Sequence, residues 1–156
     1  MLKSWVEGIT GVAVRLTRAQ FEQILAQARA EAPHECCGLL LGRGDAVEEV
    51  FAGRNVDETP ETRYVMDPLD ELRAFRLMDE RGWQLVGIYH SHPRTEAYPS
   101  ETDKSRARDD KDRPLFPGTR YVIVSLREPG NPRIRAFRLD GADSAKSVPE
   151  EDVVVT

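Results

Sequence analysis

The sequence predicts a single domain of the α/β or α+β class, with a mostly buried central β-sheet. Three observations support this class: short apolar runs alternate with stretches of helical periodicity, turn-forming residues separate the two, and the length of 156 residues suits one hydrophobic core. We expect the folded domain to cover residues 10–140. Residues 141–156 are acidic and offer little core material, so we expect them to form a flexible C-terminal tail.

The first half of the chain contains a predicted strand, helix and hairpin. Residues 12–16 predict the strand. A Thr-x-x-Gln capping box and an apolar stripe at spacings of three and four residues predict a helix over residues 17–30. The short apolar run at residues 36–41 is followed by glycine and predicts a buried strand, with residues 47–51 as its hairpin partner.

The second half continues the alternation of helices and strands. An Asp-Pro pair at the start and a glycine at the end predict a helix over residues 67–82. Residues 84–89 predict the next buried strand, and residues 100–112 predict a third helix. A Pro-Gly-Asn-Pro turn between residues 121–126 and residues 134–139 predicts a closing hairpin.

Composition argues against several functional classes. The 22 basic and 27 acidic side chains give a net charge of −5, which argues against nucleic-acid binding because a phosphate backbone needs a basic surface. No apolar run reaches the roughly 20 residues of a membrane span, so we expect no membrane partner. The two cysteines, Cys36 and Cys37, are adjacent and poorly placed to pair with each other, which favours a reducing, cytoplasmic location.

A candidate metal site follows the predicted strand at residues 84–89. His90 and His92 are two residues apart, so in an extended chain both imidazoles point to the same side. Asp103 offers a third ligand from the first turn of the helix that Ser100 caps. Two imidazoles and one carboxylate suit zinc, although iron and other metals accept similar ligands. Three protein ligands leave a fourth position for water, as in catalytic sites.

A hydrolytic site also needs a proton acceptor that does not bind the metal. Glu35, at the start of the strand at residues 36–41, is the best candidate, and the Ser100 hydroxyl can donate to a developing oxyanion. Each residue also has an ordinary interpretation: the histidines as a polar strand end, Ser100 and Asp103 as a capping box, and Glu35 as a solvated strand start. The occurrence of all these features together favours the catalytic interpretation.

This pattern resembles the signature of the JAMM/MPN metallopeptidases, in which an upstream glutamate precedes His-x-His, seven residues, Ser, two residues and Asp. Five residues match the signature without a gap or a substitution: Glu35, His90, His92, Ser100 and Asp103. The run Pro-His-Glu-Cys-Cys-Gly-Leu-Leu-Leu-Gly is similar to the glutamate-bearing strand of this family. The resemblance extends from about residue 12 to residue 139 and is closest to the compact bacterial branch.

The resemblance implies a curved mixed sheet flanked by helices, similar to the cytidine deaminase-like architecture. It implies that His90, His92 and Asp103 bind Zn²⁺. It also implies that Glu35 is the general acid/base and that Ser100 stabilises the tetrahedral intermediate. Family members cut isopeptide or peptide bonds after the C-terminal glycines of ubiquitin-like proteins, and compact bacterial members release an amino acid or a short tail from sulfur-carrier proteins. The expected partner is therefore a ubiquitin-like or sulfur-carrier protein with a Gly-Gly C-terminus.

Two other functions share parts of the pattern. An MPN-type scaffold binds its partners without metal, but such proteins usually lack ligands that this chain keeps. A RadC-like, DNA-associated protein shares the His-x-His-Pro and Ser-x-x-Asp pattern, but the acidic net charge argues against DNA as a partner. We therefore predict a zinc-dependent peptidase or isopeptidase.

Overall fold

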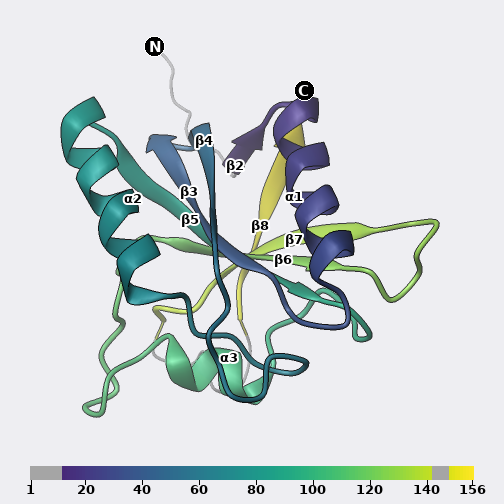
Figure 1. The fold of residues 1–156 in the computed structure, drawn as a ribbon. Coiled ribbons are helices and arrows are strands. Elements are labelled where there is room, and N and C mark those ends of the chain that lie inside the picture. The colour runs from purple at the N-terminus through teal and green to yellow at the C-terminus, as the bar shows by residue number, and fades with distance from the viewer. Residues whose placement is uncertain (1–11, 142–147) are drawn as a thin grey trace.

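The strands of the described chain, which comprises residues 12–141 and 148–156 of this computed structural model, close into a barrel in the order β2-β4-β3-β5-β6-β7-β8. The predictions for residues 10–11 and 142–147 lie outside the described residues. The elements, drawn in Figure 1, are β2 (Val12–Leu16), α1 (Arg18–Glu31), β3 (Cys37–Arg43), β4 (Ala46–Gly53), α2 (Pro68–Arg81), β5 (Gln84–His92), α3 (Glu101–Arg106), β6 (Arg120–Ser125), β7 (Arg133–Arg138) and β8 (Glu150–Val155).

The sheet is mixed, and β5 takes part in both kinds of strand pairing. β5 pairs antiparallel with β3 and parallel with β6, and β6 pairs antiparallel with β7, which confirms the predicted closing hairpin. The helices lie outside the strands in Figure 1, with α1 and α2 on opposite sides and α3 beneath the sheet. The predicted curved mixed sheet flanked by helices is therefore confirmed.

The sequence of β3 does not alternate between apolar and polar residues, and the packing of the strand explains why. Leu40 belongs to the core cluster that contains Ile24 and Leu25 of α1, whereas Leu39 belongs to a second cluster that contains Ala74 of α2. Both faces of the strand are therefore buried, and a strand buried on both faces reads as a continuous apolar run.

The ends of the first two helices follow the predicted capping chemistry. The Thr17 hydroxyl accepts the Gln20 N–H at 3.1 Å, and the Gln20 side-chain oxygen accepts the Thr17 N–H at 2.9 Å. Asp67 caps α2 by accepting the Leu69 N–H at 2.8 Å, and Gly82 ends it at φ 68°. Among the described residues, no helix combines the length and apolar composition that a membrane crossing requires.

The expectation of a flexible tail is wrong for residues 150–155, which form β8 and complete the barrel. β8, yellow in Figure 1, pairs parallel with β2 and antiparallel with β7. Two of the acidic residues that suggested a tail are paired with arginines of β7 and β6. Glu150 lies 2.7 Å from the guanidinium of Arg135, and Glu151 lies 3.1 Å from that of Arg120. The described fold therefore continues past residue 140.

The third helix is shorter than predicted and ends at Arg106. The Asp109 side chain accepts the N–H groups of Lys111 and Arg113, each at 2.9 Å. Asp112 adopts a left-handed backbone conformation with φ 59°. Aspartate side chains offer the backbone an alternative to helical hydrogen bonds, so the chain turns in this segment.

Deletion of residues 149–156 should destabilise the fold. The deletion removes β8 with its three half-buried valines and exposes the edges of β2 and β7. We expect the free energy of unfolding, measured by chemical denaturation, to fall by more than about 3 kcal/mol. Asp152→Ala, an exposed position in the same strand, is the control and should cost less than about 0.5 kcal/mol. A truncated chain of unchanged stability would show that β8 does not hold the barrel.

Candidate metal centre and catalytic residues

The register between β3 and β5 places Glu35 on the same side of the sheet as the two histidines. Cys37 of β3 lies opposite His90 of β5, and opposite residues of an antiparallel pair point to the same face. Side chains two positions apart also share a face. Glu35, two residues before Cys37, therefore faces the same side as His92, two residues after His90.

Three potential ligand atoms meet at this end of β5. His90 Nε2 lies 3.1 Å from His92 Nε2, and Asp103 Oδ2 lies 3.1 Å and 3.2 Å from these two nitrogens. A tetrahedral ion with bonds of about 2.0–2.1 Å keeps its ligands about 3.3–3.4 Å apart. The triangle therefore fits a metal ion after opening by about 0.2 Å.

The start of α3 fixes the position of Asp103. Ser100 Oγ accepts the Asp103 N–H at 3.0 Å, and Asp103 Oδ2 accepts the Ser100 N–H at 2.9 Å. The capping box that the sequence offered as an ordinary interpretation is therefore present. It coexists with the candidate metal site, because the same Oδ2 atom faces the imidazoles.

The two imidazoles are held in different ways. His92 Nδ1 donates to the carbonyl oxygen of Glu96 at 2.8 Å, and this bond leaves Nε2 free to point its lone pair at the site. His90 Nδ1 is buried without a hydrogen-bond partner. The ring of Tyr64 stacks on His90 instead, with ring centroids 4.6 Å apart and planes 26° apart. Packing therefore replaces the hydrogen bond that usually orients a metal-binding imidazole.

Glu35 is buried beside the histidines. One carboxylate oxygen of Glu35 and one ring nitrogen each of His90 and His92 lie within 4.8 Å of one another. Glu35 is 4% exposed, and its Oε1 atom has no hydrogen-bond partner. Burial raises the pKa of Glu35 to about 8, because desolvation penalises the charged form. In the metal-free protein this side chain therefore holds a proton near neutral pH.

The other charges favour an anionic Asp103 between two imidazoles. Burial alone would raise the pKa of Asp103, but its bonds to His90 and His92 outweigh this and hold the pKa well below its usual range. Burial lowers the pKa of His90. Burial also acts to lower the pKa of His92, yet its bonds to Asp103 and the Glu96 carbonyl raise it overall. A divalent cation would displace the protons that these groups share.

The structure brings together all five residues that the sequence singled out. Glu35 lies beside His90 and His92, Asp103 contacts both histidines, and Ser100 is held against Asp103. The arrangement can hold a divalent cation beside a buried carboxyl group. The roles of these residues as ligands, proton carrier and oxyanion donor stay predictions.

Three further residues hold the site together, and sequence reasoning gave none of them a role there. Asn55 donates from Nδ2 to the Glu35 carbonyl at 2.9 Å and accepts the Val65 N–H at 3.1 Å. Arg106 donates to the Tyr64 carbonyl at 3.0 Å. The preference of asparagine for bonding to backbone groups was a signal for Asn55. Tyr64 and Arg106 had no such signal, because their contacts join segments far apart in the chain.

The chain matches the family described as prokaryotic homologs of the JAB domain over residues 17–140. It is 37% identical over 128 residues to a protein of Mycobacterium tuberculosis (strain ATCC 25618 / H37Rv) named CysO-cysteine peptidase. The aligned region covers 80% of this chain and 82% of the relative. It is 40% identical over 101 residues to the probable TtuB-protein conjugate cleaving protease of Thermus thermophilus, covering 65% of this chain and 68% of the relative.

A solved structure also supports the fold. The solution structure of protein DSY2949 from Desulfitobacterium hafniense matches with a TM-score of 0.76 and 38% sequence identity. The match covers 92% of each chain. The barrel and its flanking helices are therefore shared with a relative over nearly the whole chain.

Glu35→Gln should stabilise the metal-free protein increasingly as the pH rises. The pKa of Glu35 is about 8 in the folded protein, against an ordinary value of 4.5, so the unfolded chain ionises first. The contribution of Glu35 to stability is therefore complete below pH 4.5 and is lost progressively up to pH 8. We expect a loss on the order of 2–4 kcal/mol relative to the variant.

Denaturant unfolding in a chelating buffer, repeated from pH 4.5 to pH 8.5, measures this difference. Glu48→Gln, at an exposed position of β4, is the control and should leave the free energy of unfolding within about 0.5 kcal/mol. A stability difference between wild type and Glu35→Gln that stays constant with pH would contradict the burial of an ionisable carboxyl group.

Proposed function

We propose that this chain, which belongs to the family of prokaryotic homologs of the JAB domain and is a hydrolase of the JAMM type, uses zinc to cut the amide bond after the C-terminal glycines of a ubiquitin-like or sulfur-carrier protein. The products are the carrier and an amino acid or a short tail. The observation that carries the proposal is the triangle of three ligand atoms with the buried carboxyl group of Glu35 beside it.

The residues present suit a zinc ion. His90, His92 and Asp103 would hold it, since two imidazoles and one carboxylate are ligands that zinc prefers. When bound, zinc polarises a carbonyl group and makes water a nucleophile near neutral pH. Three ligand atoms within 3.2 Å of one another, next to a buried carboxyl group, suit a metal enzyme better than a metal-free scaffold.

Two further side chains complete the chemistry. Burial favours the protonated form of Glu35 in the metal-free protein, whereas a divalent cation beside it would favour the ionised form. The ionised carboxylate would accept a proton from the attacking water and pass it to the leaving amine nitrogen. The Ser100 hydroxyl oxygen accepts the Asp103 N–H, which leaves the hydroxyl proton available for the oxyanion of the tetrahedral intermediate.

The names of the relatives support the substrate class. The mycobacterial relative is named a CysO-cysteine peptidase, and the Thermus relative is named a protease that cleaves TtuB-protein conjugates. The first name describes cleavage between CysO and cysteine, and the second describes cleavage of a conjugate between TtuB and a protein. A carrier with a Gly-Gly end and one amide-linked residue is therefore the first substrate to test.

Glu35→Gln should abolish cleavage without removing zinc. Incubation of zinc-loaded protein with a carrier whose C-terminal Gly-Gly bears an amide-linked cysteine should release cysteine, as weighed by mass spectrometry. We expect the variant to lose a factor of about 10²–10⁴ in kcat, because it cannot carry the proton, while its zinc content stays equal to wild type. Chelation should stop the wild-type reaction.

Glu48→Gln, on the exposed face of β4, is the matched control and should retain full activity. Cleavage that proceeds at the wild-type rate in Glu35→Gln, or in the chelated protein, would refute the proposed mechanism.

Tyr64→Leu should weaken zinc binding, whereas Tyr64→Phe should not. The aromatic ring orients His90, and the phenol oxygen plays no part in that stacking. Loss of such an orienting contact typically lowers metal affinity about 10–100-fold, so we expect at least about a 10-fold rise in the zinc Kd of the leucine variant. Competition with a chelating dye measures the Kd. Equal affinities in both variants would show that Tyr64 does not position His90.

A further inference from the structure

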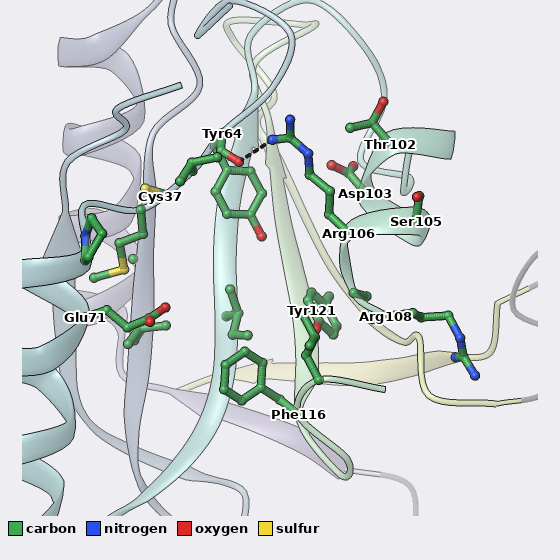
Figure 2. Close-up of a pocket in the computed structure, with 18 residues that line it drawn as sticks. Cys37, Tyr64, Glu71, Thr102, Asp103, Ser105, Arg106, Arg108, Phe116 and Tyr121 are labelled. Atoms are coloured by element: carbon green, nitrogen blue, oxygen red, sulfur yellow. Dashed lines mark hydrogen bonds between the residues drawn. The ribbon is translucent and has the colours of Figure 1, made fainter. Parts of the chain in front are cut away.

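A cavity of about 570 Å³ lies directly beside the candidate metal centre. Asp103 and Tyr64 belong both to the metal centre and to the cavity wall, so the two are continuous. Figure 2 shows the cavity between α2 and the segment that contains α3, with the Tyr64 ring projecting into it. Leu39, Ile88 and Phe116 line its apolar part.

One charged side chain on the cavity wall lacks a partner. The Glu71 carboxylate, on the first turns of α2, makes no hydrogen bond or ion pair with any described residue. Its neighbour Asp70, by contrast, is paired with Arg54 at 3.2 Å and with Arg73 at 3.0 Å. In Figure 2 the Glu71 carboxylate is directed from α2 toward the cavity.

The positive groups on the wall already have partners. Arg106 donates to Asp57 at 2.8 Å, and Arg108 donates to Asp112 at 2.7 Å. The hydroxyl groups of Tyr64 and Tyr121 have no hydrogen-bond partner among the described residues. The cavity therefore offers an apolar surface, free tyrosine hydroxyl groups and one unpaired negative charge.

We infer that this cavity takes the residues that precede the terminal glycines of the carrier, and that Glu71 selects a lysine or arginine among them. The inference rests on the proposed function, which brings the glycines to the metal centre. The methylene groups of a basic side chain suit the apolar wall, and its charged end suits an unpaired carboxylate. The volume exceeds that of one side chain and lies in the range of cavities that hold a ligand.

Binding of two synthetic peptides tests this assignment without requiring cleavage. Both are ten residues long and end in Gly-Gly-Cys. One carries lysine at the three positions before the glycines, and the other carries methionine, which has a similar shape without the charge. Calorimetry with zinc-loaded Glu35→Gln protein measures each Kd. We expect the lysine peptide to bind about 10-fold more tightly, as a charge-assisted hydrogen bond provides.

When Glu71→Gln is added to the Glu35→Gln protein, the ratio of the two peptide Kd values should fall to about 1. The amide keeps the shape of the side chain and removes its charge. Glu71→Lys should instead favour a peptide with glutamate at the same positions. Glu80→Gln, at an exposed position on the same helix, is the matched control and should keep the 10-fold preference. A preference that survives in Glu71→Gln, or an absence of preference in the parent protein, would overturn the assignment.

The outcome is separable from that of the proposed function. If wild-type protein cleaves neither peptide nor any carrier while the Glu71-dependent preference persists, the proposed hydrolysis fails and the cavity assignment stands. If the wild type cleaves both peptides at equal kcat/KM and Glu71→Gln changes neither value, the hydrolysis stands and the cavity assignment fails.

Discussion

The site depends on one anionic oxygen held against two imidazole nitrogens. Asp103 Oδ2 lies within 3.2 Å of both His90 Nε2 and His92 Nε2, and those nitrogens are 3.1 Å apart. Electron pairs this close repel unless a proton or a cation lies between them. Two features of the fold hold these atoms together: the extended backbone of β5 and the capping box that fixes the first turn of α3.

Much of the site was predictable because it follows from short-range rules. An i, i+2 spacing in a strand places His90 and His92 on one side, and a Ser-x-x-Asp cap places Asp103 at the start of a helix. Glu35 is the long-range member, and its position follows from the β3–β5 register, which the sequence does not state. Its place at the start of an apolar strand and the match to the family signature singled it out, and the register then explains its position.

The features that sequence reasoning missed have two causes: contacts between distant segments, and local bonds from side chains to the backbone. The acidic composition of residues 150–155 suggested a tail, because the arginines of β6 and β7 that pair with Glu150 and Glu151 lie elsewhere in the chain. The end of α3 depends on aspartate side chains that bond to the local backbone. The stacking of Tyr64 on His90 requires a loop to fold over the end of β5, and no periodicity in the sequence records this.

The central claim is that Glu35 lies beside the metal ion without binding it, although its carboxylate and the two histidine nitrogens lie within 4.8 Å of one another. Anomalous diffraction from zinc-soaked crystals, recorded on both sides of the zinc absorption edge, tests this most directly. The account predicts one strong peak bonded to His90, His92 and Asp103, with the Glu35 carboxylate outside bonding distance. A peak bonded to Glu35 in place of Asp103, or no peak at this end of β5, would contradict it.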